Sequence, residues 1–218
     1  MSDICICKLW YSENENEWKK ALEEYNKRIK SENKNVENDL SNISISDIKN
    51  YSGEEFYNLI HDCYIKWKYT DCRWFKGIKG CIENYNNKCG YIFFKNIHSD
   101  LLSIDKSEIE SHLRNIMRIK GIGVAGASGL LALLMPEYFG TVDQFVVKEL
   151  KKLNLGNEYE KINENDIKIN DAVLMITLMK EKAKELNEKF VTDIWTARKI
   201  DMVLWGIAPR KNDDNLHL

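Results

Sequence analysis

Apolar residues recur at intervals of three and four along most of the chain, the spacing that places side chains on one face of an α-helix. In residues 14–30 this face consists of Trp18, Leu22, Tyr25 and Ile29. The same periodicity marks the segments 52–67, 90–104, 107–117, 142–153, 173–190 and 196–207. No series of segments alternates between apolar and polar residues as strands do. The pattern therefore predicts an all-α fold.

Polar residues mark where several of these helices should begin. Ser52 and Ser107 are each followed three residues later by glutamate, the spacing of a capping box in which the two residues accept each other's backbone amide hydrogens. Thr141 is the expected cap of a further helix that carries Asp143 in its first turn, and Thr196 is the expected cap of the last helix.

The segment 31–50 has a different character, because it is rich in Ser, Asn, Lys and Glu with isolated isoleucines. This composition predicts an exposed, flexible connection with at most a short extended piece around Ile43 and Ile45. We therefore divide the chain into residues 1–50, an N-terminal helix and flexible connection, and residues 51–218, a helical core.

A glycine-rich stretch begins at Arg118, with Gly121, Gly123 and Gly126 in the G-x-G-x-x-G spacing. One interpretation is a dinucleotide-binding loop, which requires a buried strand before the glycines and a helix after them. The other is a hairpin between two helices whose turn amides hold a nucleic-acid phosphate. The preceding segment 107–117 is an amphipathic helix, and this favours a helical hairpin over residues 107–135.

Length and charge narrow the options further. A chain of 218 residues suits one domain, or two small helical lobes that share a core. Its net charge of −2 gives no general attraction to nucleic acid, so such binding needs a local basic patch. Such a patch could come from Arg114, Arg118 and Lys120, because no acidic residue lies between Arg114 and Glu137. Without a membrane-spanning run or a secretory signal, the protein is expected to be cytoplasmic and to bind no membrane.

Two further groups of side chains invite a chemical interpretation. The six cysteines lie in the first half without a C-x-x-C pair, so we expect reduced, mostly buried thiols and no metal site, although ligand sets using Cys5 and Cys7, or Cys72 and Cys89, stay open. In residues 66–79 aromatic and basic side chains alternate. They could stack on bases and contact phosphate, or the aromatics could enter the core. The candidates for a base pocket or DNA surface are Trp67, Tyr69, Arg73 and Trp74.

The order of helix, Gly121-Ile122-Gly123 turn, apolar helix and Val142-Asp143 at a helix start resembles the helix-hairpin-helix DNA glycosylase superfamily, which includes endonuclease III and the 8-oxoguanine glycosylases. The separation of Gly121 and Asp143, 143 − 121 = 22 positions, is similar to the family spacing. The resemblance extends over most of residues 50–210, and its specific part is confined to 107–150. It implies a two-lobed helical domain that contains a helix-hairpin-helix motif.

The resemblance also implies an activity. Asp143 would be the catalytic carboxylate that stabilises the positive charge on the sugar, and the damaged base would flip into an aromatic pocket. Position 125, where bifunctional members carry the nucleophilic lysine, is Ala125, so the expected enzyme is monofunctional. Contacts to double-stranded DNA would come from the turn, namely Arg118, Lys120, Gly121, Ile122, Gly123, Val124 and Ala125.

For cofactors, the resemblance implies none. No cysteine follows Cys89, so the iron-sulfur pattern of endonuclease III is absent from the sequence, whereas a monovalent cation at the hairpin is compatible with it. We expect a monomer. Three alternatives stay open at this point: Asp143 could only stabilise a helix dipole, the chain could bind DNA without cutting it, or it could be a helical protein-interaction domain.

Overall fold

The computed structural model describes residues 4–29, 31–69 and 72–210. Within these ranges it contains helices and turns but no β-strand, which confirms the predicted all-α fold. In chain order the helices are α1 (Ile6–Leu9), α2 (Glu15–Arg28), α3 (Ser31–Ser41), η1 (Asp47–Asn50), α4 (Gly53–Asn58), η2 (Leu59–Tyr64), α5 (Ile65–Lys68), α6 (Cys72–Cys89), α7 (Tyr91–Ser103), α8 (Ile109–Met117), α9 (Val124–Leu134), α10 (Gln144–Lys151), α11 (Asn157–Glu160), α12 (Ile169–Phe190) and α13 (Ala197–Ile207).

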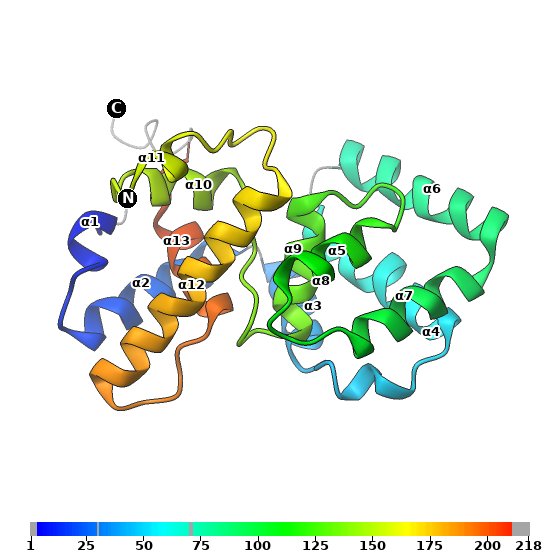
Figure 1. Ribbon diagram of the computed structural model, residues 1–218, viewed down its shortest axis with the longest axis horizontal. Helices are drawn as coiled ribbons and strands as arrows, with labels where there is room; N and C mark the ends of the chain where they lie inside the picture. Colours follow the sequence, from blue (N-terminus) through cyan, green and yellow to red (C-terminus); the bar gives the residue numbers. More distant parts are fainter. Residues whose placement is uncertain (1–3, 30, 70–71, 211–218) are drawn as a thin grey trace.

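The helices form two lobes, which Figure 1 shows side by side. The terminal lobe consists of α1, α2 and α10–α13, with α13 packed against α2, α10 and α12. The central lobe consists of α3–α9, with α7 packed against α4, α6 and α8. Contacts of α12 with α8 and α9, and of α13 with α9, join the two lobes. The buried apolar residues of both lobes therefore form one continuous core.

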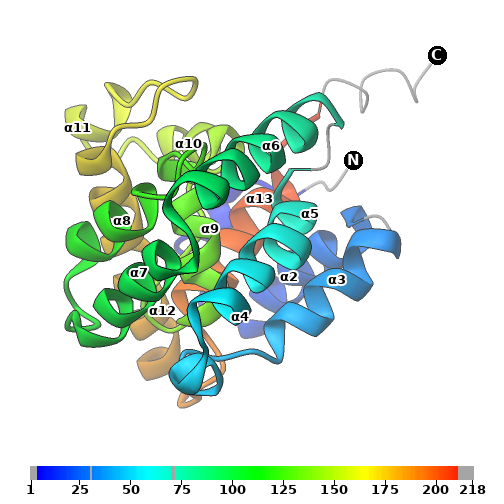
Figure 2. The ribbon, with the colours of Figure 1, turned by 90° about the vertical axis from the view of Figure 1, so that its right-hand side faces the viewer.

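Helix α9 lies near the centre of both views of the molecule (Figures 1 and 2). Its residues from Gly126 to Leu134 are all buried, as its uninterrupted run of small and apolar side chains leads one to expect. The Tyr64 hydroxyl donates a hydrogen bond to the Gly126 carbonyl, and a Cβ atom on Gly126 would lie 2.5 Å from the Tyr69 hydroxyl. The lack of a side chain at Gly126 therefore allows the tyrosines around α5 to contact α9 closely.

Three tryptophans hold the terminal lobe together. The Trp18 ring of α2 is fully buried, and its centroid lies 6.0 Å from that of Trp10 and 5.8 Å from that of Trp195. Asn14 caps α2 by accepting the amide hydrogen of Asn16. Through Trp18, the predicted apolar face of α2 contacts both Trp10, which follows α1, and Trp195, which precedes α13.

The expectation of a flexible connection over residues 31–50 is wrong, because α3 and η1 form there. Leu40 and Ile48 are buried in the core, and Glu37 is buried against α13. The Ile45 amide donates to the Leu134 carbonyl at 3.0 Å, which attaches the segment to the end of α9. These contacts reach residues distant in the sequence, so the local polar composition did not reveal them.

The predicted caps are confirmed at Ser52 and Thr196 and are wrong at Ser107 and Thr141. Ser52 forms its capping box with Glu55, and Thr196 accepts the amide hydrogen of Lys199. Ser107 caps nothing, because both its amide and its hydroxyl donate to the carboxylate of Asp105, at 2.8 and 2.6 Å. Asp105 is only two residues from Ser107, so its carboxylate competes with Glu110 for the Ser107 amide and prevents the capping box.

Among residues 4–29, 31–69 and 72–210, no helix has both the length and the apolar character needed to span a lipid bilayer.

Substitution of Gly206 tests the packing of α13 on α2. A Cβ atom there would lie 2.6 Å from the Tyr25 backbone nitrogen, so Gly206→Ala must separate the helices and should lower the free energy of unfolding by about 1–3 kcal/mol. Gly77 of α6 has no atom within 4 Å of its notional Cβ, so Gly77→Ala should raise that free energy by about 0.5–1 kcal/mol. Urea unfolding measures both, and equal effects would contradict this packing.

Candidate active site

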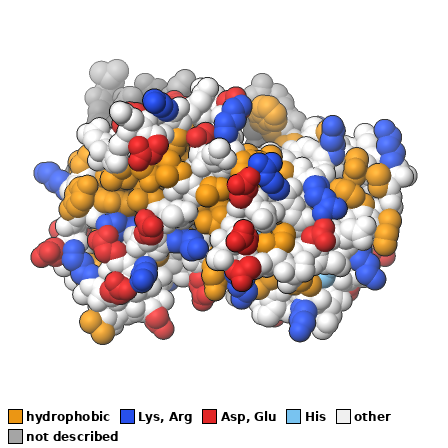
Figure 3. All heavy atoms as spheres, in the orientation of Figure 1, with side chains coloured by type: hydrophobic (Ala, Val, Ile, Leu, Met, Phe, Trp, Pro, Cys, Tyr) orange, Lys and Arg blue, Asp and Glu red, His pale blue; other side chains and the backbone are white. Residues whose placement is uncertain are grey.

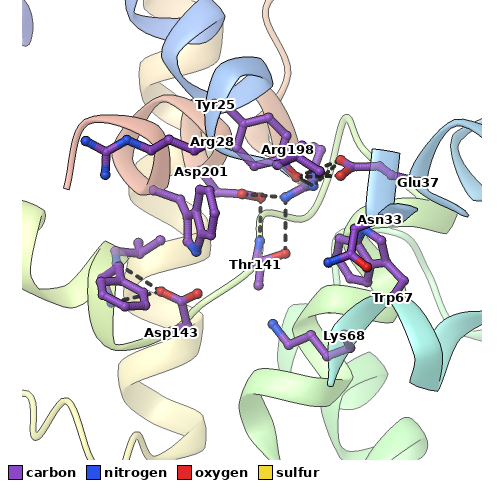
Figure 4. A pocket seen from close by; sticks show the side chains of 14 residues that line it. Tyr25, Arg28, Asn33, Glu37, Trp67, Lys68, Thr141, Asp143, Arg198 and Asp201 are labelled. Atoms are coloured by element: carbon purple, nitrogen blue, oxygen red, sulfur yellow. Dashed lines mark hydrogen bonds and ion pairs between the residues drawn. The ribbon is translucent and has the colours of Figure 1, made fainter. Parts of the chain in front are cut away.

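A pocket of about 400 Å³ lies where the two lobes meet (Figure 4). Its walls come from α2 and α3, from the end of α5, from the loop between α9 and α10, and from α10 and α13. The lining residues whose side chains matter below are Tyr25, Glu37, Trp67, Lys68, Thr141, Asp143, Phe145, Arg198, Asp201 and Trp205. The volume falls within the range of small-molecule sites in proteins.

Asp143 stands at the point where the loop from the central lobe enters α10. Its Oδ1 atom accepts the amide hydrogens of Phe145 at 2.9 Å and Val146 at 3.1 Å, so Asp143 is the N-cap of α10. The expectation that Thr141 is the cap, with Asp143 in the first turn, is wrong. Within the described part of the chain, Oδ2 of Asp143 has no hydrogen-bond partner. This oxygen remains available to a ligand in the pocket.

Thr141 has a different role because Asp201 binds its backbone. The Thr141 amide donates to Oδ2 of Asp201 at 2.6 Å, and its hydroxyl lies 3.4 Å from Nη1 of Arg198. The loop that carries Asp143 is therefore attached to α13. The partner lies 60 residues away in the sequence, which explains why the pattern around Thr141 misled the cap assignment.

The Arg198 guanidinium is buried and joins both lobes at the pocket. It donates to Asp201 at 2.6 Å within α13, to the Tyr25 hydroxyl of α2 at 2.6 Å, and to Glu37 of α3 at 2.8 Å. The same group lies 5.4 Å from the centroid of the Trp67 ring. Burial raises the pKa of the Tyr25 hydroxyl, so this group stays protonated and donates to Glu37. The guanidinium, the two carboxylates and the tyrosine hydroxyl of this network are therefore all hydrogen-bonded to one another.

Asp201 is almost fully buried beside Arg198. Burial raises the pKa of its carboxyl to about 7, and the Asp143 charge acts in the same direction, whereas Arg198, the Thr141 amide and Lys68 oppose the rise. Asp201 therefore positions the loop and Arg198, and its protonation can change near neutral pH.

Trp67 and Lys68 form the opposite wall, at the end of α5. Figure 4 shows the Lys68 ammonium directed towards the side of the pocket where Asp143 and Asp201 lie. Burial lowers the pKa of Lys68 and Arg198 lowers it further, whereas Asp143 and Asp201 raise it. The six-residue π-helix η2 precedes α5; such insertions are uncommon and often occur near functional sites.

The other residues of the aromatic and basic segment lie elsewhere. Tyr69 packs on α9 at Gly126, and Trp74 is 66% exposed on α6. The side chain of Arg73 lies outside the described residues. Of the three candidates whose side chains are described, Trp67 lines the pocket with Asp143.

The predicted turn lies at the N-terminal end of α9. Gly121 adopts a φ of +96°, which favours glycine, and Gly123 is the N-cap residue of α9 with no side chain capping the helix. The turn glycines are exposed, Ile122 is buried, and Val124 and Ala125 are half-buried. Helix α9 contacts Lys68 at Gly129. Gly129 lies six residues after Gly123, so about 9 Å of helix separates the turn from this contact.

The basic residues of the turn differ in their surroundings. Arg118 forms an ion pair with Asp100 and donates to Asn115 at 2.9 Å. Lys120 is exposed, and no ion pair to it occurs within the described ranges. Over the face shown in Figure 3, lysine and arginine side chains are interspersed with acids rather than gathered into one basic patch.

The cysteines lie on the surface, contrary to the expectation of mostly buried thiols. All six are exposed and unpaired, because their positions fall on the outer faces of their helices and turns. Among the described residues, no group of three or more His, Cys, Asp or Glu side chains is placed to hold a metal ion.

Sequence reasoning missed most of the pocket. Asp143 and Trp67 were candidates, whereas Lys68 and Arg198 were not. The i, i+3 pair Arg198 and Asp201 on an otherwise apolar helix face was a usable signal, because charged side chains on such a face need buried partners. The sequence around Lys68 offered no comparable signal, because most of the residues that surround it in the pocket come from distant parts of the chain.

Substitution of Arg198 tests the network. Arg198→Met leaves the carboxylates of Asp201 and Glu37 buried without their cation, and should lower the free energy of unfolding by about 3–5 kcal/mol. Arg114 is the control, because it is exposed and pairs with Glu110 along α8, so Arg114→Met should change that free energy by about 0.5 kcal/mol or less. Similar losses for the two variants in urea unfolding would refute the role given to Arg198.

A scan against protein-family models, a search of curated proteins and a search of solved structures each found no match to this chain. The chemistry of the pocket is accordingly the basis on which a function can be proposed.

Proposed function

We propose that this protein is a helix-hairpin-helix DNA glycosylase, which removes a damaged base that has flipped out of double-stranded DNA. The observation that carries the proposal is the position of Asp143 in a pocket between two helical lobes, with one carboxylate oxygen bound to helix amides and the other free of hydrogen bonds within the described residues. The spacing of Asp143 from the Gly121 turn points to the same residue independently of the pocket.

The chemistry fits the group that Asp143 offers. Cleavage of an N-glycosidic bond builds positive charge on the sugar, and a fixed carboxylate beside C1′ stabilises that charge in the transition state. The cap on α10 fixes the side chain, so little reorganisation is needed as the charge develops. The position of Asp143 between the two lobes, where it is half-buried, strengthens the effect relative to bulk water.

The pocket walls suit a planar, aromatic ligand. Tyr25, Trp67, Phe145 and Trp205 all line it, and bases stack favourably on such rings. These features support a nucleobase as the group that the pocket accepts.

DNA backbone contact is assigned to the turn between α8 and α9. The amides at the start of α9 have no side-chain cap, Gly123 has no neighbour within 4 Å of its notional Cβ, and a helix N-terminus attracts phosphate. Lys120 would add a positive charge beside them. One helix, α9, would then link the phosphate contact to the pocket.

Asp143→Asn tests the catalytic assignment. An asparagine can still cap α10, so the fold should be kept, whereas loss of the negative charge should lower the rate of base release by about 100- to 1000-fold. Duplexes that carry oxidised, deaminated or alkylated bases are incubated with protein, and hot alkali then reveals strand breaks at the emptied sites. Asp166→Asn, at an exposed acid, is the control and should leave the rate unchanged. Absence of base release from every duplex by the unaltered protein would refute the proposal, and DNA binding without release would indicate a non-catalytic module.

Binding of undamaged duplex tests the turn. Lys120→Ala should weaken binding at low salt and reduce the slope of log K against log salt by about 1, because one phosphate contact is lost. Arg118→Ala should have a smaller effect, since Asp100 already neutralises Arg118. Lys184, exposed on α12, is the control. An equal loss for Lys120→Ala and Lys184→Ala in a filter-binding titration would place the DNA elsewhere.

A further inference from the structure

Lys68 is half-buried and lacks the polar partners that the buried Lys182 has. Lys182 donates to the Trp10 carbonyl at 3.1 Å and to Glu185 at 2.5 Å, and lies 4.7 Å from the centroid of the Trp10 ring. Lys68 forms no hydrogen bond or ion pair with any described residue. A lysine kept for stability is expected to be paired as Lys182 is, because an ammonium that is partly removed from water without a polar partner destabilises the fold.

The position of Lys68 is fixed by packing. Its Nζ and Cδ atoms lie 3.4 Å from where a Cβ of Gly129 would be, so the missing side chain of Gly129 gives the lysine room along α9. Nζ also lies 5.9 Å from the centroid of the Trp67 ring. The side chain therefore enters the pocket from the central lobe, while Asp143 enters it from the loop that begins α10 (Figure 4).

Burial of Lys68 favours a reactive amine, and it outweighs the two nearby carboxylates. Burial and the neighbouring Arg198 both lower the pKa of Lys68, although Asp143 and Asp201 act against them. Desolvation beside a second cation is the arrangement that turns a lysine into a nucleophile, because it increases the share of the neutral amine. The charges of Asp143 and Asp201 act on Lys68 from within the pocket, but neither carboxylate forms an ion pair with it among the described residues.

We propose that Lys68 is the amine nucleophile of this site and forms a covalent imine with C1′ of the deoxyribose. This inference rests on the proposed glycosylase function and changes the expected outcome of the reaction. Position 125 is alanine, so the second helix of the hairpin lacks a lysine, and the sequence therefore predicted a monofunctional enzyme. The structure brings an amine to the same pocket from a different helix.

The atoms balance without an oxidant or a cofactor. Neutral Nζ attacks C1′ while the bond from C1′ to the base breaks, and the base leaves with that electron pair. The positively charged Nζ loses a proton, which the base takes up. The lone pair of Nζ then forms the C1′=Nζ bond as the bond from C1′ to O4′ breaks, and O4′ takes a proton from water. The resulting hydroxide removes the remaining proton from Nζ, which regenerates water and leaves the neutral imine. Asp143 stabilises the positive charge at C1′ during both steps.

Borohydride trapping on an abasic-site duplex tests Lys68 without knowledge of the damaged base. The Lys68 amine should condense with the C1′ aldehyde, with loss of water, and borohydride should reduce the imine to a stable adduct. Peptide mapping by mass spectrometry of the unaltered protein should place the adduct on Lys68. Lys68→Arg, which keeps the positive charge, should abolish it, while Lys184→Arg should trap as the unaltered protein does.

The outcomes separate this inference from the proposed function. No adduct with the unaltered protein, an adduct on another lysine, or undiminished trapping by Lys68→Arg would each overturn the role of Lys68. Base release without any adduct would leave the glycosylase proposal standing and remove this one. An adduct on Lys68 with no base release from any duplex would establish the reactive amine and remove the glycosylase proposal.

Discussion

The buried Arg198 guanidinium is the interaction on which the rest of the site depends. It holds one carboxylate from each lobe, Asp201 in α13 and Glu37 in α3, and the hydroxyl of Tyr25 in α2. A buried charge is costly unless it is fully paired, so the guanidinium can remain only while all three elements are in place. The same requirement fixes the relative position of the two lobes at the pocket.

The network also determines what the pocket offers to a ligand. Because Asp201 is occupied by Arg198 and by the Thr141 amide, it positions the loop, whereas Asp143 keeps an oxygen that no described group occupies. Lys68 faces this loop from the other lobe. The site therefore contains one carboxylate oxygen, Oδ2 of Asp143, and one amine without hydrogen-bond partners in the described structure, set among groups that have them. That contrast distinguishes candidate reacting groups from structural ones.

Local patterns predicted much of the fold because they concern interactions between near neighbours. Helical periodicity and the caps at Ser52 and Thr196 depend on residues three or four apart, and these predictions are confirmed. The errors arose where a distant or competing partner decided the outcome. The polar helix α3 is held by Glu37 and Leu40 against the rest of the protein, and Thr141 lost its capping role to Asp143 because its own amide is bound by Asp201. Lys68 belongs to the same class, since only the meeting of two lobes gives it its surroundings.

The three glycines of the G-x-G-x-x-G spacing have separate physical roles, although the motif presents them as a unit. Gly121 adopts a positive φ and packs against Cys81 and Ile78 of α6, so it shapes the turn. Gly126 faces the Tyr69 hydroxyl, and a side chain there would displace α5 together with Lys68. Gly123 has no neighbour within 4 Å of its notional Cβ and is therefore the glycine free to approach a phosphate. The spacing of the motif therefore does not reflect one shared role: its first glycine shapes the turn, its last glycine allows Tyr69 to contact α9, and only its middle glycine is left for the proposed phosphate contact.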